Sequence, residues 1–286
     1  NRAHGDSAKS MLFLRNYAME RFLERLSASK YRNCFILKGG MLISAMVGID
    51  SRATMDIDTT LRNYPLNCES AEQIVRQIAD VEIDDKISFV IKKTEEIMEE
   101  SEYHGVRLSL DAYLDKTRIP LKIDISTGDV ITPCEISFSY QLMFETRTIP
   151  LLAYPPETVL AEKLETILSR GEANTRLRDF YDVYILQRGD FIVTPDALRY
   201  ALLATCRKRG HEELLHTYTS ILDGVRQSGA MRAQWMKYQS DFDYAAGIAW
   251  DAVVDTVETL CMKTLDNPVF GDELPQKESQ FEMHLL

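Results

Sequence analysis

Two short motifs, Lys38-Gly39-Gly40 and Asp56-Ile57-Asp58, carry the most information in this chain. The apolar run 34–37 that precedes the glycines is typical of a buried strand, and 41–47 predicts a short helix after them. A glycine pair between a strand and a helix lets a phosphate approach the backbone closely, and the helix N-terminus adds a partial positive charge. The sequence therefore predicts a phosphate-binding turn at Gly39-Gly40.

The second motif lies in an alternating stretch, 54–60, that predicts a strand. Residues i and i+2 of a strand share a face, so the Cα atoms of Asp56 and Asp58 would lie roughly 6–7 Å apart with both carboxylates pointing together. A divalent cation such as Mg²⁺ is the usual partner of such a pair. The alternative is two solvated aspartates on an edge strand, but Met55 and Ile57 indicate that one face packs in the core.

A third carboxylate, Asp124, interrupts the apolar strand pattern of 121–125. Burying it in a central strand would be unfavourable unless it were paired or metal-bound. Lys122 shares its face, so a plain Lys–Asp contact is the alternative to a metal site. Asp56, Asp58 and Asp124 together form a candidate site for one or two Mg²⁺ ions.

Two predicted helices after Pro156 carry a further group of charged residues. Lys163 and Arg170 lie at i and i+7 on one helix, and Asp179 and Asp182 lie at i and i+3 on the next. An ordinary solvated helix pair with weak ion pairs would explain them. The functional alternative is a lysine that binds nucleotide phosphates, positioned by an aspartate or arginine.

The remaining pattern predicts an α+β protein in two parts. Domain 1–150 would hold the mixed strands and helices, and domain 151–286 would be almost entirely helical. The further strands are predicted at 87–92, 107–114 and 118–126. The further helices are predicted at 7–26, 69–79, 157–169, 175–187, 195–208, 211–223, 229–238 and 241–264, with an irregular tail from Asp266.

Composition limits the classes of protein that this chain can represent. Its 286 residues include 33 Lys and Arg against 44 Asp and Glu, a net charge of 33 − 44 = −11. This balance argues against nonspecific coating of nucleic acid but allows a local basic groove. Apolar stretches such as 245–254 are shorter than the ~20 residues of a membrane span. Five scattered cysteines indicate a reducing cytoplasm rather than a disulfide framework or a zinc site.

Taken in order, the motifs KGG, RxTxDIDxT, LKIDI, AEKLETILSR and RxRDFYDVYIL over about residues 35–190 resemble the AbiEii/AbiGii toxin family of nucleotidyltransferase-like proteins. These are the toxin halves of bacterial type IV toxin–antitoxin systems, which act in abortive phage infection. The resemblance implies a polymerase-β-like nucleotidyltransferase core, a small mixed sheet with helices, followed by a helical C-terminal half. Many members of the wider superfamily carry Gly-Ser in the first motif. With Gly39-Gly40 instead, backbone amides would hold the nucleotide.

The resemblance also implies a role for each matching residue. Catalytic roles would fall to Asp56, Asp58, Lys163 and Asp182. Metal binding would fall to Asp56, Asp58 and Asp124. Nucleotide binding would fall to Lys38, Gly39, Gly40, Thr54, Lys163 and Asp179. The candidates for binding an RNA acceptor are Arg170, Arg176 and Arg178, with Arg207-Lys208-Arg209 further on, although cations are favoured at a helix C-terminus in any case.

The function that this resemblance implies is Mg²⁺-dependent transfer of a nucleotide from an NTP to an acceptor, with RNA, notably a tRNA 3′ end, as the expected acceptor. The cognate antitoxin would act without a stable complex, and the protein would work in the bacterial cytoplasm without a membrane. Two alternatives stay open. One is a degenerate module that binds nucleotide or RNA without transfer. The other is a small-molecule nucleotidyltransferase of the antibiotic-modifying type, since a charge of −11 suits a cationic acceptor.

Overall fold

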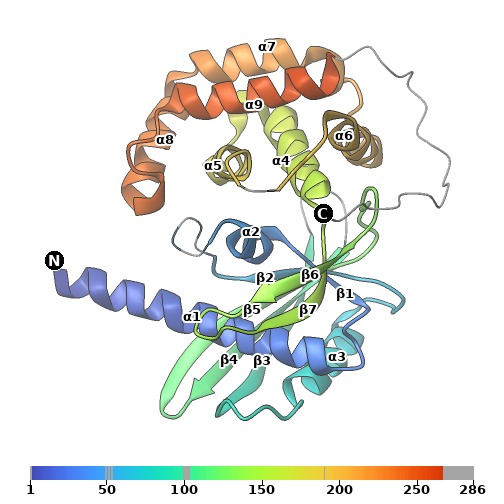
Figure 1. Ribbon diagram of the computed structural model, residues 1–286, viewed down its shortest axis with the longest axis vertical. Coiled ribbons are helices and arrows are strands. Elements are labelled where there is room, and N and C mark those ends of the chain that lie inside the picture. Colours follow the sequence, from blue (N-terminus) through green and yellow to red (C-terminus); the bar gives the residue numbers. More distant parts are fainter. Residues whose placement is uncertain are drawn as a thin grey trace.

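The computed structural model describes residues 2–48, 50, 52, 54–98, 104–189 and 191–266. A seven-stranded mixed sheet with flanking helices is followed along the chain by a helical half, so the predicted α+β class is confirmed (Figure 1). The strands are β1 (Phe35–Lys38), β2 (Ile57–Leu61), β3 (Ile87–Met98), β4 (His104–Leu114), β5 (Thr117–Ser126), β6 (Ile136–Gln141) and β7 (Thr148–Ala153). The helices are α1 (Arg2–Ala28), α2 (Gly39–Val47), α3 (Cys68–Ala79), α4 (Pro156–Arg170), α5 (Leu177–Leu186), α6 (Pro195–Arg209), α7 (Leu214–Gln227), α8 (Gly229–Asp241) and α9 (Trp250–Leu265).

The strand order is β3-β4-β5-β2-β1-β7-β6. β2 therefore lies between β5, to which it runs parallel, and β1, to which it runs antiparallel. The register places Asp58 of β2 opposite Lys38 of β1 on one side and opposite Asp124 of β5 on the other. The centre of the sheet thus brings together the charged residues that the sequence singled out.

Helices cover the sheet on both sides. α1 packs on β5 and β7 through a stripe of buried residues at helical spacing, Met19, Phe22, Leu23 and Leu26, and α3 packs on β3 beside it. α2 lies between the sheet and α5. Figure 1 shows α4–α9 on the side of the sheet where α2 lies, with α1 and α3 on the other. The start of β2 is therefore bordered by α2 and the helical half.

Several elements differ from the sequence analysis. β6 and β7 were not predicted. In β7 the proline at position 150 interrupts the strand signal; it sits opposite Ser139 in the β6–β7 pair, while β7 pairs with β1 only beyond it. β2 begins at Ile57 rather than at Thr54. The predicted helix over 241–264 is replaced by a 3₁₀ turn at Asp243–Ala245 and α9, separated by Gly247 with φ +77°.

In the described part of the chain the strands end with β7, and only helical elements follow, close to the predicted boundary at residue 150. The division into two domains itself remains a prediction. The predicted tail after Asp266 lies outside the described residues. Among the described helices, none combines the length and apolar character that crossing a bilayer requires. The five cysteines are free thiols.

Candidate active site

The turn from β1 into α2 is built around the side chain of Asp58. Gly39 has φ +64°, a left-handed conformation that favours glycine. A Cβ on Gly39 would lie 2.1 Å from the Asp58 carboxylate, and the amide of Gly40 donates a hydrogen bond of 3.3 Å to the same oxygen. Glycine at position 39 is therefore required for Asp58 to reach the start of α2.

The second glycine makes room for a different pair of side chains. A Cβ on Gly40 would lie 2.5 Å from the Thr54 hydroxyl oxygen and 3.3 Å from Nη2 of Arg52. Both side chains come from the segment that leads into β2, and both are buried. The structure thus brings Gly39, Gly40 and Thr54 together, as the sequence predicted, and adds Arg52, which it did not.

Three carboxylates lie next to this turn, and nearby cations neutralise their negative charge only in part. Asp58 and Asp124 are register partners on β2 and β5, and Asp56 directly precedes β2. Burial, then the charges of Asp124 and Asp56, raise the pKa of Asp58 to about 6. Burial and the charge of Asp124 also raise the pKa of Asp56.

Such a donor set fits a hard divalent cation, because oxygen ligands that repel one another are stabilised by a metal between them. Among the described residues, however, no three His, Cys, Asp or Glu side chains form a preassembled metal cluster. Mg²⁺ sites of this kind are completed by substrate phosphates and water. The metal roles of Asp56, Asp58 and Asp124 therefore remain predictions that the chemistry of the donors supports.

Asp124 has a partner that the sequence did not reveal. Nε and Nη2 of Arg107, directly opposite on β4, donate to its two oxygens at 2.7 and 2.6 Å. The alternative contact with Lys122 is not the one that forms, and Lys122 is exposed. Arg107 was missed because the pairing of β4 with β5 depends on a register that the motif does not contain.

Lys38, a predicted nucleotide-binding residue, lies in a buried polar network. Its Nζ donates to Ser126 Oγ at 2.7 Å and to Asp129 Oδ2 at 2.9 Å. Asp129 also accepts a bond of 2.6 Å from Ser126 Oγ. Burial opposes the charge of Asp129, but Lys38 and these hydrogen bonds outweigh it and lower its pKa. Asp129 thus holds the Lys38 ammonium in place beside β2.

Charged residues of α4 and α5 form a second cluster together with Arg52, in which two cations face two carboxylates. Lys163 Nζ lies 2.5 Å from Asp179 and 3.1 Å from Asp182, and Nε of Arg52 lies 2.6 Å from Asp182. Burial opposes the charge of Lys163, but Asp179 and Asp182 outweigh it and raise its pKa. Asp182 is fully buried, and burial is likewise outweighed by Arg52 and Lys163, which lower its pKa. Arg52 joins this cluster to the glycine turn.

The predicted acceptor-binding arginines lie at the edge of this cluster. Arg176 contacts Asp179 at 3.1 Å, and burial together with the charge of Arg176 lowers the pKa of Arg170. Arg178 lies over the ring of Phe242, 5.6 Å from its centroid. The structure therefore groups Arg170 and Arg176, whereas Arg178 packs on Phe242 in the helical half.

The more distant basic run at the end of α6 is engaged in holding helices together. Arg209 forms ion pairs with Glu165 and Glu162 of α4, and Glu165 also contacts His211 at 2.6 Å. Arg207 pairs with the exposed Glu212. The ion pairs with α4 therefore explain Arg209 without a role in binding RNA.

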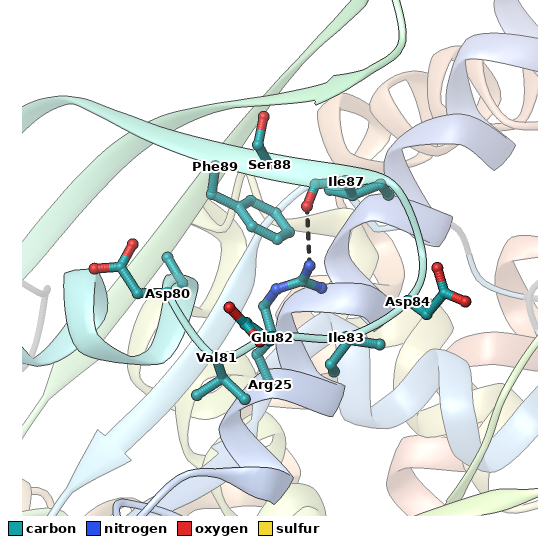
Figure 2. A pocket seen from close by; sticks show the side chains of 10 residues that line it. Arg25, Asp80, Val81, Glu82, Ile83, Asp84, Ile87, Ser88 and Phe89 are labelled. Atoms are coloured by element: carbon teal, nitrogen blue, oxygen red, sulfur yellow. Dashed lines mark hydrogen bonds between the residues drawn. The ribbon is translucent and has the colours of Figure 1, made fainter.

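A separate hollow of about 540 Å³ lies between the end of α3 and the start of β3. Figure 2 shows the Arg25 guanidinium inside it, bonded to the carbonyl of Ile87 and lying near the Phe89 ring. Arg25 also donates to both oxygens of Asp85, at 2.5 and 2.8 Å. These bonds tie the 80–85 loop to α1. None of the predicted site residues lines this hollow, which is distinct from the candidate active site.

Carboxylates on the sheet and cations on the helices thus meet at the N-terminus of α2. The N-terminus of α2 itself favours anions. Carboxylates can hold a divalent cation, while Lys163, Arg52 and the backbone amides can bind phosphate oxygens. This arrangement is chemically suited to a polyphosphate with its counter-ion.

Comparisons with known proteins agree with this geometry. The model of a family described as "Nucleotidyl transferase AbiEii toxin, Type IV TA system" matches residues 21–256. A search of the curated proteins found no match. Two solved structures resemble this fold, each with a TM-score of 0.50 and 14% sequence identity. One is a proposed nucleotidyltransferase from H. pylori (88% of this chain and 96% of that chain covered), and the other is JHP933 from Helicobacter pylori (88% and 93%).

Proposed function

Because the chain belongs to the AbiEii family of nucleotidyltransferase toxins of type IV toxin–antitoxin systems, we propose that it transfers a nucleoside monophosphate from a Mg²⁺-bound NTP to an RNA acceptor, notably a tRNA 3′ end. The observation that carries this proposal is the close approach of Asp58 and Arg52 to the Gly39-Gly40 turn. This approach brings the carboxylates of the sheet and the cations Arg52 and Lys163 together at the N-terminus of α2.

Each set has a distinct part in the reaction. Asp56 and Asp58, with Asp124, would hold one or two Mg²⁺ ions, which when bound neutralise phosphate charge and favour ionisation of the acceptor hydroxyl. Lys163 would bind the β- and γ-phosphates of the NTP together with the amide of Gly39, while the Gly40 amide donates to Asp58. Asp179 and Asp182 orient Lys163, and Asp182 also orients Arg52. Arg170 and Arg176, at the edge of the Lys163 cluster, would contact the acceptor away from its reacting end.

Label transfer tests the proposal directly. The protein is incubated with each α-³²P-labelled NTP, Mg²⁺ and total bacterial RNA, beside an Asp58→Ala variant, and the products are resolved on a gel. We expect label in a tRNA-sized band that is lost with EDTA and in the variant. If no NTP labels any RNA or protein of a whole lysate, the degenerate binding module or the small-molecule enzyme becomes the better hypothesis.

The antitoxin partner belongs to the same proposal. A type IV toxin–antitoxin family implies a cognate antitoxin, and we expect it to counteract the toxin without forming a stable complex. Co-purification from cells that express both genes would contradict this expectation. Toxicity that persisted in Asp58→Ala would separate the toxic effect from nucleotide transfer.

A further inference from the structure

Arg15 of α1 lies at the Asp56 motif with few partners of its own. In the described part of the chain, the one hydrogen-bond partner of its guanidinium is the sulfur of Met55, 2.7 Å from Nη1. Its Nε is buried and has no partner. A guanidinium offers five donors, and a thioether is a weak acceptor. Arg15 therefore presents unused donor capacity next to Asp56.

Lys122 of β5 is a strand neighbour of Asp56. β2 and β5 run parallel with Ile57 opposite Ile123, so the residues just before them, Asp56 and Lys122, are neighbours in the extended register. Lys122 is exposed and forms no side-chain hydrogen bond or ion pair with the described residues. Both cations thus lie beside Asp56.

These cations lie across β2 from the nucleotide-binding elements. In the strand order, β1 and the glycine turn lie on one side of β2, and β5 with Lys122 lies on the other. Lys163 and Arg52 belong to the glycine-turn side. If the triphosphate binds there, in-line attack brings the reacting end of the acceptor to the carboxylates from the β5 side. Arg107 on that side is already bonded twice to Asp124.

We propose that Arg15 and Lys122 form an anion-binding position that takes backbone phosphates of the acceptor strand. This inference rests on the proposed function and specifies the acceptor further. A cationic small molecule, such as an aminoglycoside, would be repelled by two cations here, whereas a nucleic acid would be attracted. The acceptor side of this otherwise acidic protein is therefore suited to RNA rather than to a polycationic antibiotic.

The test measures RNA binding and nucleotide transfer separately. The probe is a 5′-fluorescein-labelled RNA hairpin with a single-stranded 3′ end, titrated with the full chain at several KCl concentrations in Mg²⁺ and followed by anisotropy. Arg15→Gln and Lys122→Gln should each weaken binding about fivefold and make the slope of log K against log [KCl] shallower by about 0.7–0.9. Arg15→Lys keeps the charge and should retain most of the affinity.

The matched control is Lys237→Gln, which removes an exposed cation of α8 and should change neither quantity. Thermal melts check that the variants fold, and the exposed Lys122 keeps the test valid if Arg15→Gln is unstable. The Km for the NTP should stay unchanged, because these residues lie on the acceptor side.

Wild-type RNA affinity in both glutamine variants would overturn the inference, as would label transfer to an aminoglycoside in place of RNA. The proposed function can fail independently. If the wild type transfers no nucleotide but the two variants still lose RNA affinity, the anion-binding position stands and the transfer activity does not.

Discussion

At the scale of single residues, Asp58 carries a charge that the fold only partly neutralises. Its pKa is raised to about 6 from 3.8, so the folded state binds this proton more tightly than the unfolded state. The ionised carboxylate therefore lowers the free energy of unfolding very little below about pH 4. This loss of stability grows as the pH rises to about 6 and reaches its full size above that pH.

The raised pKa of Asp58 predicts how Asp58→Asn changes the stability of the protein. The amide keeps the acceptor for the Gly40 amide but removes the charge, so the free energy of unfolding at pH 7.5 in EDTA should rise by about 1–3 kcal/mol. At pH 4.5 the change should be much smaller. Urea unfolding at both pH values measures it. Equal stabilisation at the two pH values would show that relief of this charge is not the cause.

Asp182 illustrates why loss of activity alone cannot assign a catalytic role. Asp182→Ala would leave the buried Arg52 without its carboxylate, and breaking a buried ion pair on one side costs about 3–5 kcal/mol. We expect the Tm to fall by roughly 10 °C. Lys163→Gln leaves the Arg52–Asp182 pair intact and should lower the Tm much less while abolishing transfer. Calorimetry measures the Tm of both variants. Equal Tm losses would contradict the expectation that Asp182 contributes more to stability than Lys163.

At the scale of elements, the start of α2 depends on the glycine at position 39. Gly39→Ala combines a positive φ with a Cβ placed 2.1 Å from the Asp58 carboxylate, so either the helix start or Asp58 must move. We expect a Tm loss of several degrees and loss of label transfer. Gly48→Ala is the matched control, since Gly48 has φ +91° but nothing within 4 Å. It should retain activity, and similar losses in both variants would assign the effect to backbone strain.

The contact between α4 and α6 depends on the buried carboxylate of Glu165. Glu165→Ala should destabilise the protein by about 2–4 kcal/mol, because Arg209 keeps only its longer contacts with Glu162 and the Thr166 hydroxyl. Glu212→Ala, which removes an exposed pair with Arg207, should cost less than about 1 kcal/mol. Chemical denaturation of both variants tests this difference. A change below 1 kcal/mol for Glu165→Ala would show that apolar packing alone holds the two helices.

At the scale of the whole molecule, the candidate site is assembled from both halves of the chain. Mg²⁺ with an NTP at about 100 times its Kd should stabilise the folded state by about 2.7 kcal/mol, because the ligand would bridge carboxylates of the sheet and cations of α4. The rise in Tm should be largest at pH 7.5 and shrink at pH 5, where Asp58 is mostly protonated. Differential scanning fluorimetry with EDTA as control measures it. An unchanged rise at pH 5 would exclude Asp58 from metal binding.

The sequence alone was sufficient for features that depend on neighbouring residues. Alternation and helical spacing predicted most elements, and the glycine turn and the Asp56-Ile57-Asp58 motif were recognisable because each is local in the chain. The strands β6 and β7 were missed, and in β7 a proline weakens the local signal. The resemblance to the AbiEii family rests on the same local motifs, and the family match over residues 21–256 confirms it.

Only the tertiary structure decided which charges meet. Arg107 pairs with Asp124 through the β4–β5 register, and Arg52 pairs with Asp182 across 130 positions of the chain. Such pairings have no local signature, because ion pairs form wherever the packing of apolar faces brings opposite charges together. The sequence by itself therefore identified Asp56, Asp58 and the Gly39-Gly40 turn as candidate site residues. The fold determined which cations neutralise them and which remain available to a substrate.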